Sequence, residues 1–107
     1  MRILVTGGAG FLGSSLVESL VKHGHAVIVI DNCWRGTKEN LRAVLDNITF
    51  IEGDACVTAT YEMITNPGSV DLVYHLAAIN GTKWFHEEPR MVMDVNLNST
   101  LRSLEFA

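Results

Sequence analysis

The feature that most constrains the fold of this chain is a glycine-rich segment near its amino terminus, Thr6–Gly13, which reads TGGAGFLG. An almost continuously apolar run, Arg2–Thr6, leads into it and predicts a strand that is buried on both faces. The segment that follows, Phe11–His23, repeats apolar residues with helical spacing at Leu12, Leu16, Val17, Leu20 and Val21. A strand that turns through glycines into a helix predicts the first half of a βαβ unit.

The glycines of this segment have separable physical tasks. Gly7 or Gly8 lets the chain turn tightly out of the strand, and Gly13 lets the helix pack closely on the sheet. Gly10 has no side chain, so the backbone there can approach a diphosphate closely. The N–H groups at the start of the helix then point toward the diphosphate. Two spacings remain open, Gly8-Gly10-Gly13 and Gly7-Gly10-Gly13, and both predict a dinucleotide site in this strand-and-helix context.

An acidic residue at the end of the second predicted strand supports the same interpretation. His25–Asp31 is β-rich and apolar, and Asp31 lies 18 residues after Gly13. A carboxylate there can accept hydrogen bonds from both ribose hydroxyls of an adenosine and repels a 2′-phosphate. We therefore expect NAD rather than NADP, although Arg35, in the loop after Asp31, keeps NADP as an alternative because it could accommodate the phosphate.

The rest of the chain continues the alternation of strands and helices. It predicts a short helix at Glu39–Leu45, a strand at Ile48–Glu52, a weak helix at Cys56–Thr65, a turn at Asn66–Gly68, a strand at Val70–Leu76, a long loop at Ala77–Glu88 and a helix from about Pro89. The expected inner face of that last helix is Val92, Val95, Leu101 and Leu104. The long loop starts at the carboxyl end of a central strand, so its residues 80–86 are candidates for substrate contact.

This order of elements predicts one α/β domain over residues 1–107. The fold class is a Rossmann-type, doubly wound parallel sheet with helices on both faces, truncated to four strands. Right-handed crossovers give the strand order 3-2-1-4, with the switch point between strands 1 and 4.

Composition and charge exclude several classes of function. Eight basic residues against twelve acidic residues give a net charge of −4, which argues against nucleic-acid partners and against a polybasic membrane patch. The longest uncharged stretch, Ile3–Val17, is too short and too rich in glycine to span a membrane. Cys33 and Cys56 are too few and too far apart for a disulfide scaffold or a zinc site, so we expect a cytoplasmic protein with no metal.

Taken together, five segments resemble the extended short-chain dehydrogenase/reductase family, in its nucleotide-sugar epimerase and dehydratase branch. The matching segments are Thr6–Gly13, Asp31-Asn32 with Gly36 and Asn40-Leu41, Gly53-Asp54, His75–Ala78 and Asn96–Thr100. Two positions depart from the family pattern. Val57 stands where a second acid is frequent, and Ser99 replaces the usual glycine of the last helix.

The resemblance implies an NAD cofactor and a nucleotide-sugar substrate, in a protein that could form homodimers when complete. It implies that Asn96 supports the catalytic geometry near the nicotinamide. The residues that it implies for cofactor binding are Gly7, Gly10, Phe11, Leu12, Gly13, Asp31, Asn32, Asp54, Ala55, Leu76, Ala77 and Ala78.

The catalytic Tyr-x-x-x-Lys pair of that family has no counterpart in these residues. The two tyrosines, Tyr61 and Tyr74, are followed four positions later by Thr65 and Ala78 rather than by lysine. We therefore interpret the chain as the amino-terminal part of a longer enzyme, with a non-catalytic NAD(P)-binding sensor as the alternative. Taken alone, it should leave its fourth strand as an exposed apolar edge, so we expect marginal stability or self-association.

Overall fold

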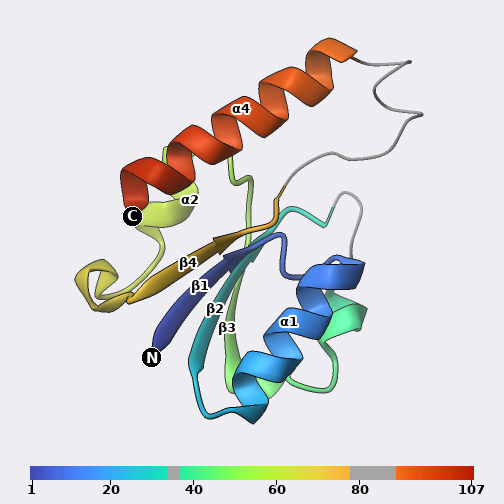
Figure 1. The fold of residues 1–107 in the computed structure, drawn as a ribbon, viewed down its shortest axis with the longest axis vertical. Coiled ribbons are helices and arrows are strands. Elements are labelled where there is room, and N and C mark those ends of the chain that lie inside the picture. Colours follow the sequence, from blue (N-terminus) through green and yellow to red (C-terminus); the bar gives the residue numbers. More distant parts are fainter. Residues whose placement is uncertain (34–36, 78–88) are drawn as a thin grey trace.

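The computed structural model describes residues 1–33, 37–77 and 89–107, and at residues 89 and 92 only the backbone. Short 3-10 helices are labelled η. The elements, drawn in Figure 1, are β1 (Arg2–Thr6), α1 (Phe11–Lys22), β2 (Ala26–Asp31), η1 (Lys38–Leu41), η2 (Leu45–Asn47), β3 (Ile48–Glu52), α2 (Thr58–Glu62), η3 (Pro67–Ser69), β4 (Leu72–His75) and α4 (Pro89–Phe106).

The four strands form one parallel sheet in the order β3-β2-β1-β4, which confirms the predicted topology. Thr6, at the end of β1, lies opposite Ile30 of β2 and His75 of β4. Asp31 at the end of β2 lies opposite Glu52 of β3. This register brings the carboxyl ends of all four strands to the same end of the sheet. Ligands bind at that end in open α/β sheets.

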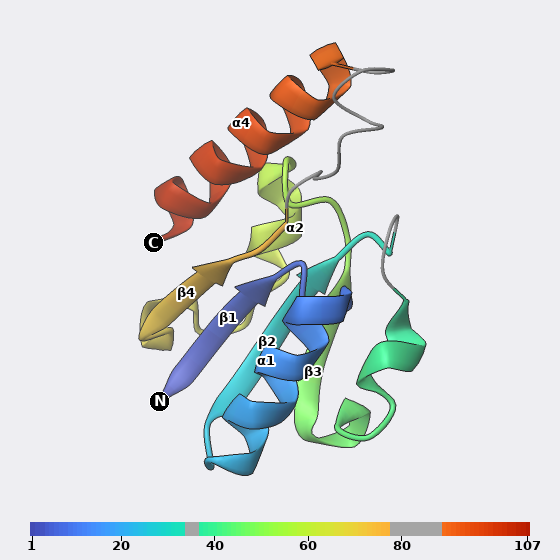
Figure 2. The same cartoon turned by 45° about the vertical axis from the view of Figure 1, so that its right-hand side comes forward.

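Helices cover both faces of the sheet, as predicted. Figures 1 and 2 show α1 on one face, and α2 with α4 on the other. The sheet has a hydrophobic core on each face, because successive side chains of a strand point to opposite faces. The core under α1 contains Ile3, Val5, Val17, Val27, Val29 and Leu41, and the core under α2 and α4 contains Leu4, Ile28, Ile30, Ile51, Tyr61 and Ile64.

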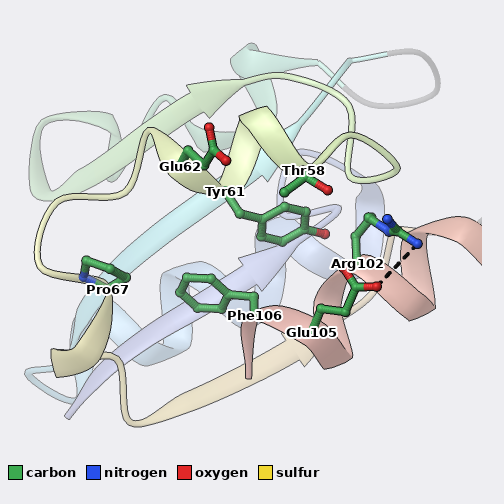
Figure 3. Close-up of a pocket in the computed structure, with 7 residues that line it drawn as sticks. All are labelled: Thr58, Tyr61, Glu62, Pro67, Arg102, Glu105 and Phe106. Atoms are coloured by element: carbon green, nitrogen blue, oxygen red, sulfur yellow. Dashed lines mark ion pairs between the residues drawn. The ribbon is translucent and has the colours of Figure 1, made fainter.

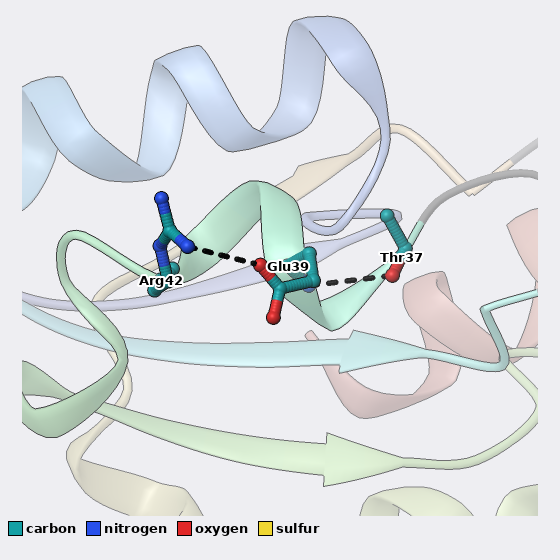
Figure 4. Close-up of polar contacts among 3 residues, drawn as sticks. All are labelled: Thr37, Glu39 and Arg42. Atoms are coloured by element: carbon teal, nitrogen blue, oxygen red, sulfur yellow. Dashed lines mark hydrogen bonds and ion pairs between the residues drawn. The ribbon is translucent and has the colours of Figure 1, made fainter.

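The connection between β2 and β3 differs from the predicted helix at Glu39–Leu45. It forms two 3-10 turns, η1 and η2, with hydrogen bonds from the Arg42 N–H to the Glu39 carbonyl and from the Val44 N–H to the Leu41 carbonyl. Figure 4 shows the start of η1, where Thr37 Oγ1 accepts the Glu39 N–H at 3.3 Å, and the exposed Glu39–Arg42 ion pair. The tighter turns bury Leu41 and Val44 against the sheet within a short connection.

The other boundaries are close to the prediction, with two shorter elements. The weak helix expected at Cys56–Thr65 is only the five-residue α2, and the fourth strand is Leu72–His75 rather than Val70–Leu76. The Asn66–Gly68 turn is present as η3, entered through Asn66 in the left-handed region at φ 51°.

The inner face of α4 is not the predicted one. Leu104 is 67% exposed and Leu101 is exposed as well, whereas Ser99 is only 1% exposed and Ser103 is buried. The reason is polar: the surface under α4 presents His75 and Tyr61, whose hydrogen bonds the two serines satisfy. Val95 is half-buried, and the side chain of Val92 lies outside the described residues.

Strand β4 forms one edge of the sheet among the described residues. It pairs with β1, and Leu72, Tyr74 and Leu76 are each between 38% and 40% exposed. This is the apolar edge that the sequence predicts.

Candidate functional site

The turn from β1 into α1 requires glycine at Gly7. Its φ is +72°, and a Cβ there would lie 2.7 Å from the Ala77 nitrogen and from the Leu76 carbonyl carbon. The Gly7 N–H donates to the Ile30 carbonyl at 2.8 Å. The tight turn is therefore wedged between the carboxyl ends of β2 and β4, at the switch point of the sheet.

Gly13 and Gly10 differ in the space that a Cβ atom would find at each position. A Cβ on Gly13 would overlap the Gly7 carbonyl oxygen and lie 2.9 Å from Gly8 Cα. A Cβ on Gly10 would meet only the Gly7 carbonyl oxygen, at 3.5 Å, an ordinary contact. Gly13 thus brings the helix close to the turn, whereas Gly10 leaves space in front of the loop.

The amino terminus of α1 lies beside that space. Gly10 is the N-cap residue, no side chain among the described residues caps the helix, and its first turn holds no acidic residue. The first-turn N–H groups of a helix lack partners within the helix and favour an anion. Phe11 is 85% exposed and Leu12 is also exposed, so both predicted cofactor-binding side chains lie at the open surface of this helix end.

Asp31 lies at the end of β2, with its carboxylate tied to the backbone of two loops. It is only 9% exposed. Its Oδ2 accepts the Ala9 N–H at 2.9 Å, and its Oδ1 accepts the Cys33 N–H at 2.7 Å. Each carboxylate oxygen has a further lone pair, so these bonds fix the group and leave it able to accept ribose hydroxyls. Asn32, beside it, is exposed.

The glycine loop is also tied through the carbonyl of Ala9. This oxygen accepts the Asn40 Nδ2–H at 2.8 Å and the Thr37 N–H at 3.1 Å. The Ala9 N–H is thus held by Asp31 at the end of β2, and the Ala9 carbonyl by the segment that follows β2. The diphosphate loop and the ribose segment therefore form one preorganised unit.

Replacing Asn40 by aspartate should weaken this unit. Asn40→Asp keeps the shape of the side chain but points a carboxylate oxygen, rather than a donor, at the Ala9 carbonyl. We expect the free energy of unfolding to fall by about 1–2 kcal/mol in urea denaturation. The matched control is Asn47→Asp, at an exposed position at the end of η2. An equal loss in both variants would contradict the role of the Asn40–Ala9 bond.

The end of β3 provides the residues predicted for the adenine. Asp54 is exposed, and its Oδ1 accepts the Cys56 N–H at 2.8 Å, which closes the turn after β3. Ala55 is buried, and its carbonyl accepts the Tyr61 hydroxyl at 2.8 Å. Burial, together with the charge of Asp54, raises the pKa of the Cys56 thiol to about 11, so this thiol stays protonated and unreactive at neutral pH.

On the β4 side, the structure brings the predicted residues Leu76 and Ala77 against the glycine turn. Asn96 lies half-buried on α4, and its main-chain carbonyl accepts the Thr100 hydroxyl at 2.8 Å. Ala78, Arg35 and the candidate substrate contacts at 80–86 lie outside the described residues.

The sequence analysis does not predict the side-chain hydrogen bonds that join the glycine loop, the end of β4 and α4 at this end of the sheet. In the sequence, Thr6, Asn40, His75 and Ser99 stand only as members of the segments that resemble the family. The structure gives each a defined partner: Asn40 bonds to Ala9, while Thr6 and Ser99 both contact the His75 ring. For Thr6, His75 and Ser99, the sequence signal is a polar residue at a position in a strand or helix where a buried face should be apolar.

A cavity of about 230 Å³ lies elsewhere, between α2 and the carboxyl end of α4 (Figure 3). Its lining is mainly apolar and includes Tyr61, Phe106 and Pro67. It lies on the face of the sheet that α2 and α4 cover, and its lining includes none of the residues predicted for the dinucleotide. It is not part of the candidate dinucleotide site.

Within the described residues, no helix is both long and apolar enough to cross a membrane. In the same part of the chain, no group of three or more His, Cys, Asp or Glu side chains could hold a metal ion.

Comparison with known proteins identifies relatives over the whole chain. Sequence relatives include a UDP-N-acetyl-alpha-D-glucosaminuronate decarboxylase of Bacillus cytotoxicus, 37% identical over 99% of this chain and 32% of the relative. A UDP-glucose 4-epimerase of Mycolicibacterium smegmatis is 36% identical over 100% of this chain and 34% of the relative. The chain thus spans about one third of the length of these relatives.

Solved structures show the same relationship. The UDP-glucose 4-epimerase of Thermotoga maritima with UDP-glucose superposes with a TM-score of 0.89 at 38% identity, over 99% of this chain and 33% of that one. The Thermus thermophilus UDP-glucose 4-epimerase in complex with NAD superposes with a TM-score of 0.88 at 38% identity, with the same coverage. The sequence model of one family, described as the NAD dependent epimerase/dehydratase family, matches residues 3–107. This chain belongs to the NAD-dependent epimerase/dehydratase family.

Proposed function

We propose that these residues form the NAD-binding part of an enzyme that acts on a nucleotide sugar. The observation that carries the proposal is the joint geometry of the glycine turn and Asp31. Gly10 leaves open space in front of the start of α1, which no described side chain caps. Asp31, at the end of the adjacent strand β2, is fixed by the Ala9 N–H. This pairs an anion site with a ribose acceptor at the switch point of a parallel sheet.

The residues present fit the two halves of a dinucleotide. The diphosphate would lie against the backbone of Gly10–Gly13, with the adenosine ribose on Asp31 and the adenine beside Asp54 and Ala55. Because the adenosine half occupies the β2–β3 side, the nicotinamide half falls on the other side of the switch point, near Ala77 and α4. NAD supplies reversible hydride transfer when it is bound.

For the whole protein we propose epimerase, dehydratase or decarboxylase chemistry on a nucleotide sugar. The support is the family and the names of its relatives, among them a UDP-glucuronic acid decarboxylase of Arabidopsis thaliana that is 39% identical over this chain. The 107 residues contain no Tyr-x-x-x-Lys pair, so the proposal assigns them cofactor binding rather than proton transfer. Homodimerisation and a cytoplasmic location belong to this proposal as well.

Calorimetric titration with NAD and NADP tests the binding proposal. We expect saturable binding of NAD and binding of NADP weaker by about tenfold or more, because the added phosphate would face the Asp31 carboxylate. Gly10→Ala should weaken NAD binding by about tenfold, because its methyl group fills the space in front of the loop. Gly68→Ala, whose Cβ would meet no heavy atom within 4 Å, serves as the control.

Two results would contradict the proposal. One is no saturable NAD binding by a chain that circular dichroism shows to be folded. The other is equal NAD affinity in Gly10→Ala and Gly68→Ala, which would place the ligand away from the glycine loop.

A further inference from the structure

His75 lies at the carboxyl end of β4, half-buried under α4, with a hydroxyl group on each side of its ring. Its Nδ1 lies 2.7 Å from Thr6 Oγ1 and 3.2 Å from Ser103 Oγ. Its Nε2 lies 3.2 Å from Thr100 Oγ1 and 3.3 Å from Ser99 Oγ. The ring therefore lies between β1 and the hydroxyl groups of Ser99, Thr100 and Ser103 on α4.

The partners of Thr6 determine which ring nitrogen carries the proton. Thr6 Oγ1 accepts the Leu76 N–H at 3.1 Å and the Ala77 N–H at 3.2 Å. Backbone N–H groups can only donate, so both lone pairs of this oxygen are used. The hydroxyl proton is then left to donate to His75 Nδ1, which must be unprotonated.

The partners of Nε2 agree with this assignment. Thr100 Oγ1 donates to the Asn96 carbonyl at 2.8 Å, and Ser99 Oγ donates to the Ala77 carbonyl at 3.0 Å. Both hydroxyl oxygens can therefore accept an N–H from the ring. Burial lowers the pKa of His75 below its usual value of 6.5, so the ring is neutral at pH 7 with its single proton on Nε2.

The same network reaches the adenine side of the site. Tyr61 donates its hydroxyl proton to the Ala55 carbonyl at 2.8 Å, so the phenol oxygen can accept the single hydroxyl proton of Ser103 at 3.1 Å. The Ser103 contact with His75 Nδ1 is then not a hydrogen bond, and Nδ1 accepts from Thr6 alone. Polar links thus run from the end of β1 through His75 and α4 to the turn after β3. These hydrogen bonds define the rotation of α4 about its own axis and its position along the sheet.

We propose that His75 is a positioning residue, which as the Nε2–H tautomer fixes α4 and the Ala77 backbone at the nicotinamide half of the dinucleotide site. This inference rests on the proposed NAD function. It assigns to His75 no contact with the ligand and no part in proton transfer. Its effect reaches the ligand through Ala77 and through Asn96, one turn before Thr100 on α4.

The tautomer can be tested on the unmodified chain. A long-range ¹⁵N–¹H correlation spectrum of the imidazoles at pH 7 should show His75 Nδ1 as the unprotonated nitrogen and Nε2 as the protonated one. A protonated Nδ1 would overturn the inference, because Thr6 would then have no acceptor for its hydroxyl proton. This readout does not depend on ligand binding or on the folding of any variant.

Comparing two ligands tests the positioning effect. ADP reaches Asp31 and the glycine loop, whereas NAD extends further to the Ala77 side. In His75→Gln we expect NAD affinity to fall about tenfold and ADP affinity to change by less than about twofold. Thr100→Val, on the exposed side of α4, removes one acceptor of the Nε2–H and should show the same pattern to a smaller degree. His23→Gln, an exposed histidine at the end of α1, is the control.

The outcomes separate this inference from the proposed function. Equal losses of ADP and NAD affinity in His75→Gln would show a purely structural role of His75 and would overturn this inference but not the proposed function. Unchanged NAD affinity in both His75→Gln and Thr100→Val would also overturn it. Failure of the unmodified, folded chain to bind either ligand would overturn the proposed function, and the positioning role with it. The tautomer spectrum would still decide whether the Thr6–His75 link exists.

Discussion

Gly13→Ala is expected to lower the free energy of unfolding by about 3 kcal/mol or more. The added Cβ would overlap the Gly7 carbonyl oxygen and lie 2.9 Å from Gly8 Cα and 3.0 Å from the Gly7 carbonyl carbon. These are backbone atoms of a turn that itself packs against Ala77. Moving either the turn or α1 aside would therefore cost free energy. Urea denaturation followed by circular dichroism measures the loss.

Gly68→Ala is the matched control for this substitution. It adds the same methyl group at a glycine with no heavy atom within 4 Å of the new Cβ, and it should change stability by less than about 0.5 kcal/mol. A Gly13→Ala variant as stable as the control would mean that α1 can move away from the turn. The close approach of helix and loop would then not be a requirement of this fold.

Asp31→Ala is expected to reduce NAD affinity by about 100-fold or more. The carboxylate supplies two charge-assisted acceptors for ribose hydroxyls, and such bonds contribute about 1.5–3 kcal/mol each. The variant should also lose about 2 kcal/mol of stability, because the fully buried Ala9 N–H and the Cys33 N–H lose their acceptors. Calorimetric titration and urea denaturation measure the two effects separately.

A ligand lacking one hydroxyl separates recognition from folding. The unmodified chain should prefer ADP to 2′-deoxy-ADP, and Asp31→Ala should bind the two equally, whereas a structural defect would weaken both in proportion. Asp46→Ala, at an exposed acidic position on η2, should change neither affinity nor stability. A retained preference for ADP in Asp31→Ala would place the ribose elsewhere.

The connections between strands were the part of the fold that the sequence predicted least well. The expected helix at Glu39–Leu45 carries apolar residues at helical spacing, yet the chain forms two 3-10 turns there. The structure shows a further constraint on this connection: it must bury Leu41 and Val44 while holding Asn40 against Ala9. Local preference alone does not contain that requirement, because Ala9 is 31 residues away from Asn40.

The face of α4 shows a similar limit for helices. Apolar periodicity places Leu101 and Leu104 inside, but the buried positions are Ser99 and Ser103. A buried hydroxyl is costly unless it is hydrogen-bonded, so its place depends on partners that sequence spacing does not reveal. Those partners, His75 and Tyr61, are 24 and 42 residues away along the chain.

The fold class, the strand order 3-2-1-4 and the glycine turn at the switch point are predictable from the amino-acid sequence. These follow from local periodicity, from glycine stereochemistry and from the right-handedness of crossovers, all of which act over short stretches of chain. Only the tertiary structure decided the rotation of α4, the backbone bonds that fix Asp31, and the tautomer of His75. Each of these depends on which polar groups, far apart in the sequence, are left to satisfy one another once the sheet has formed.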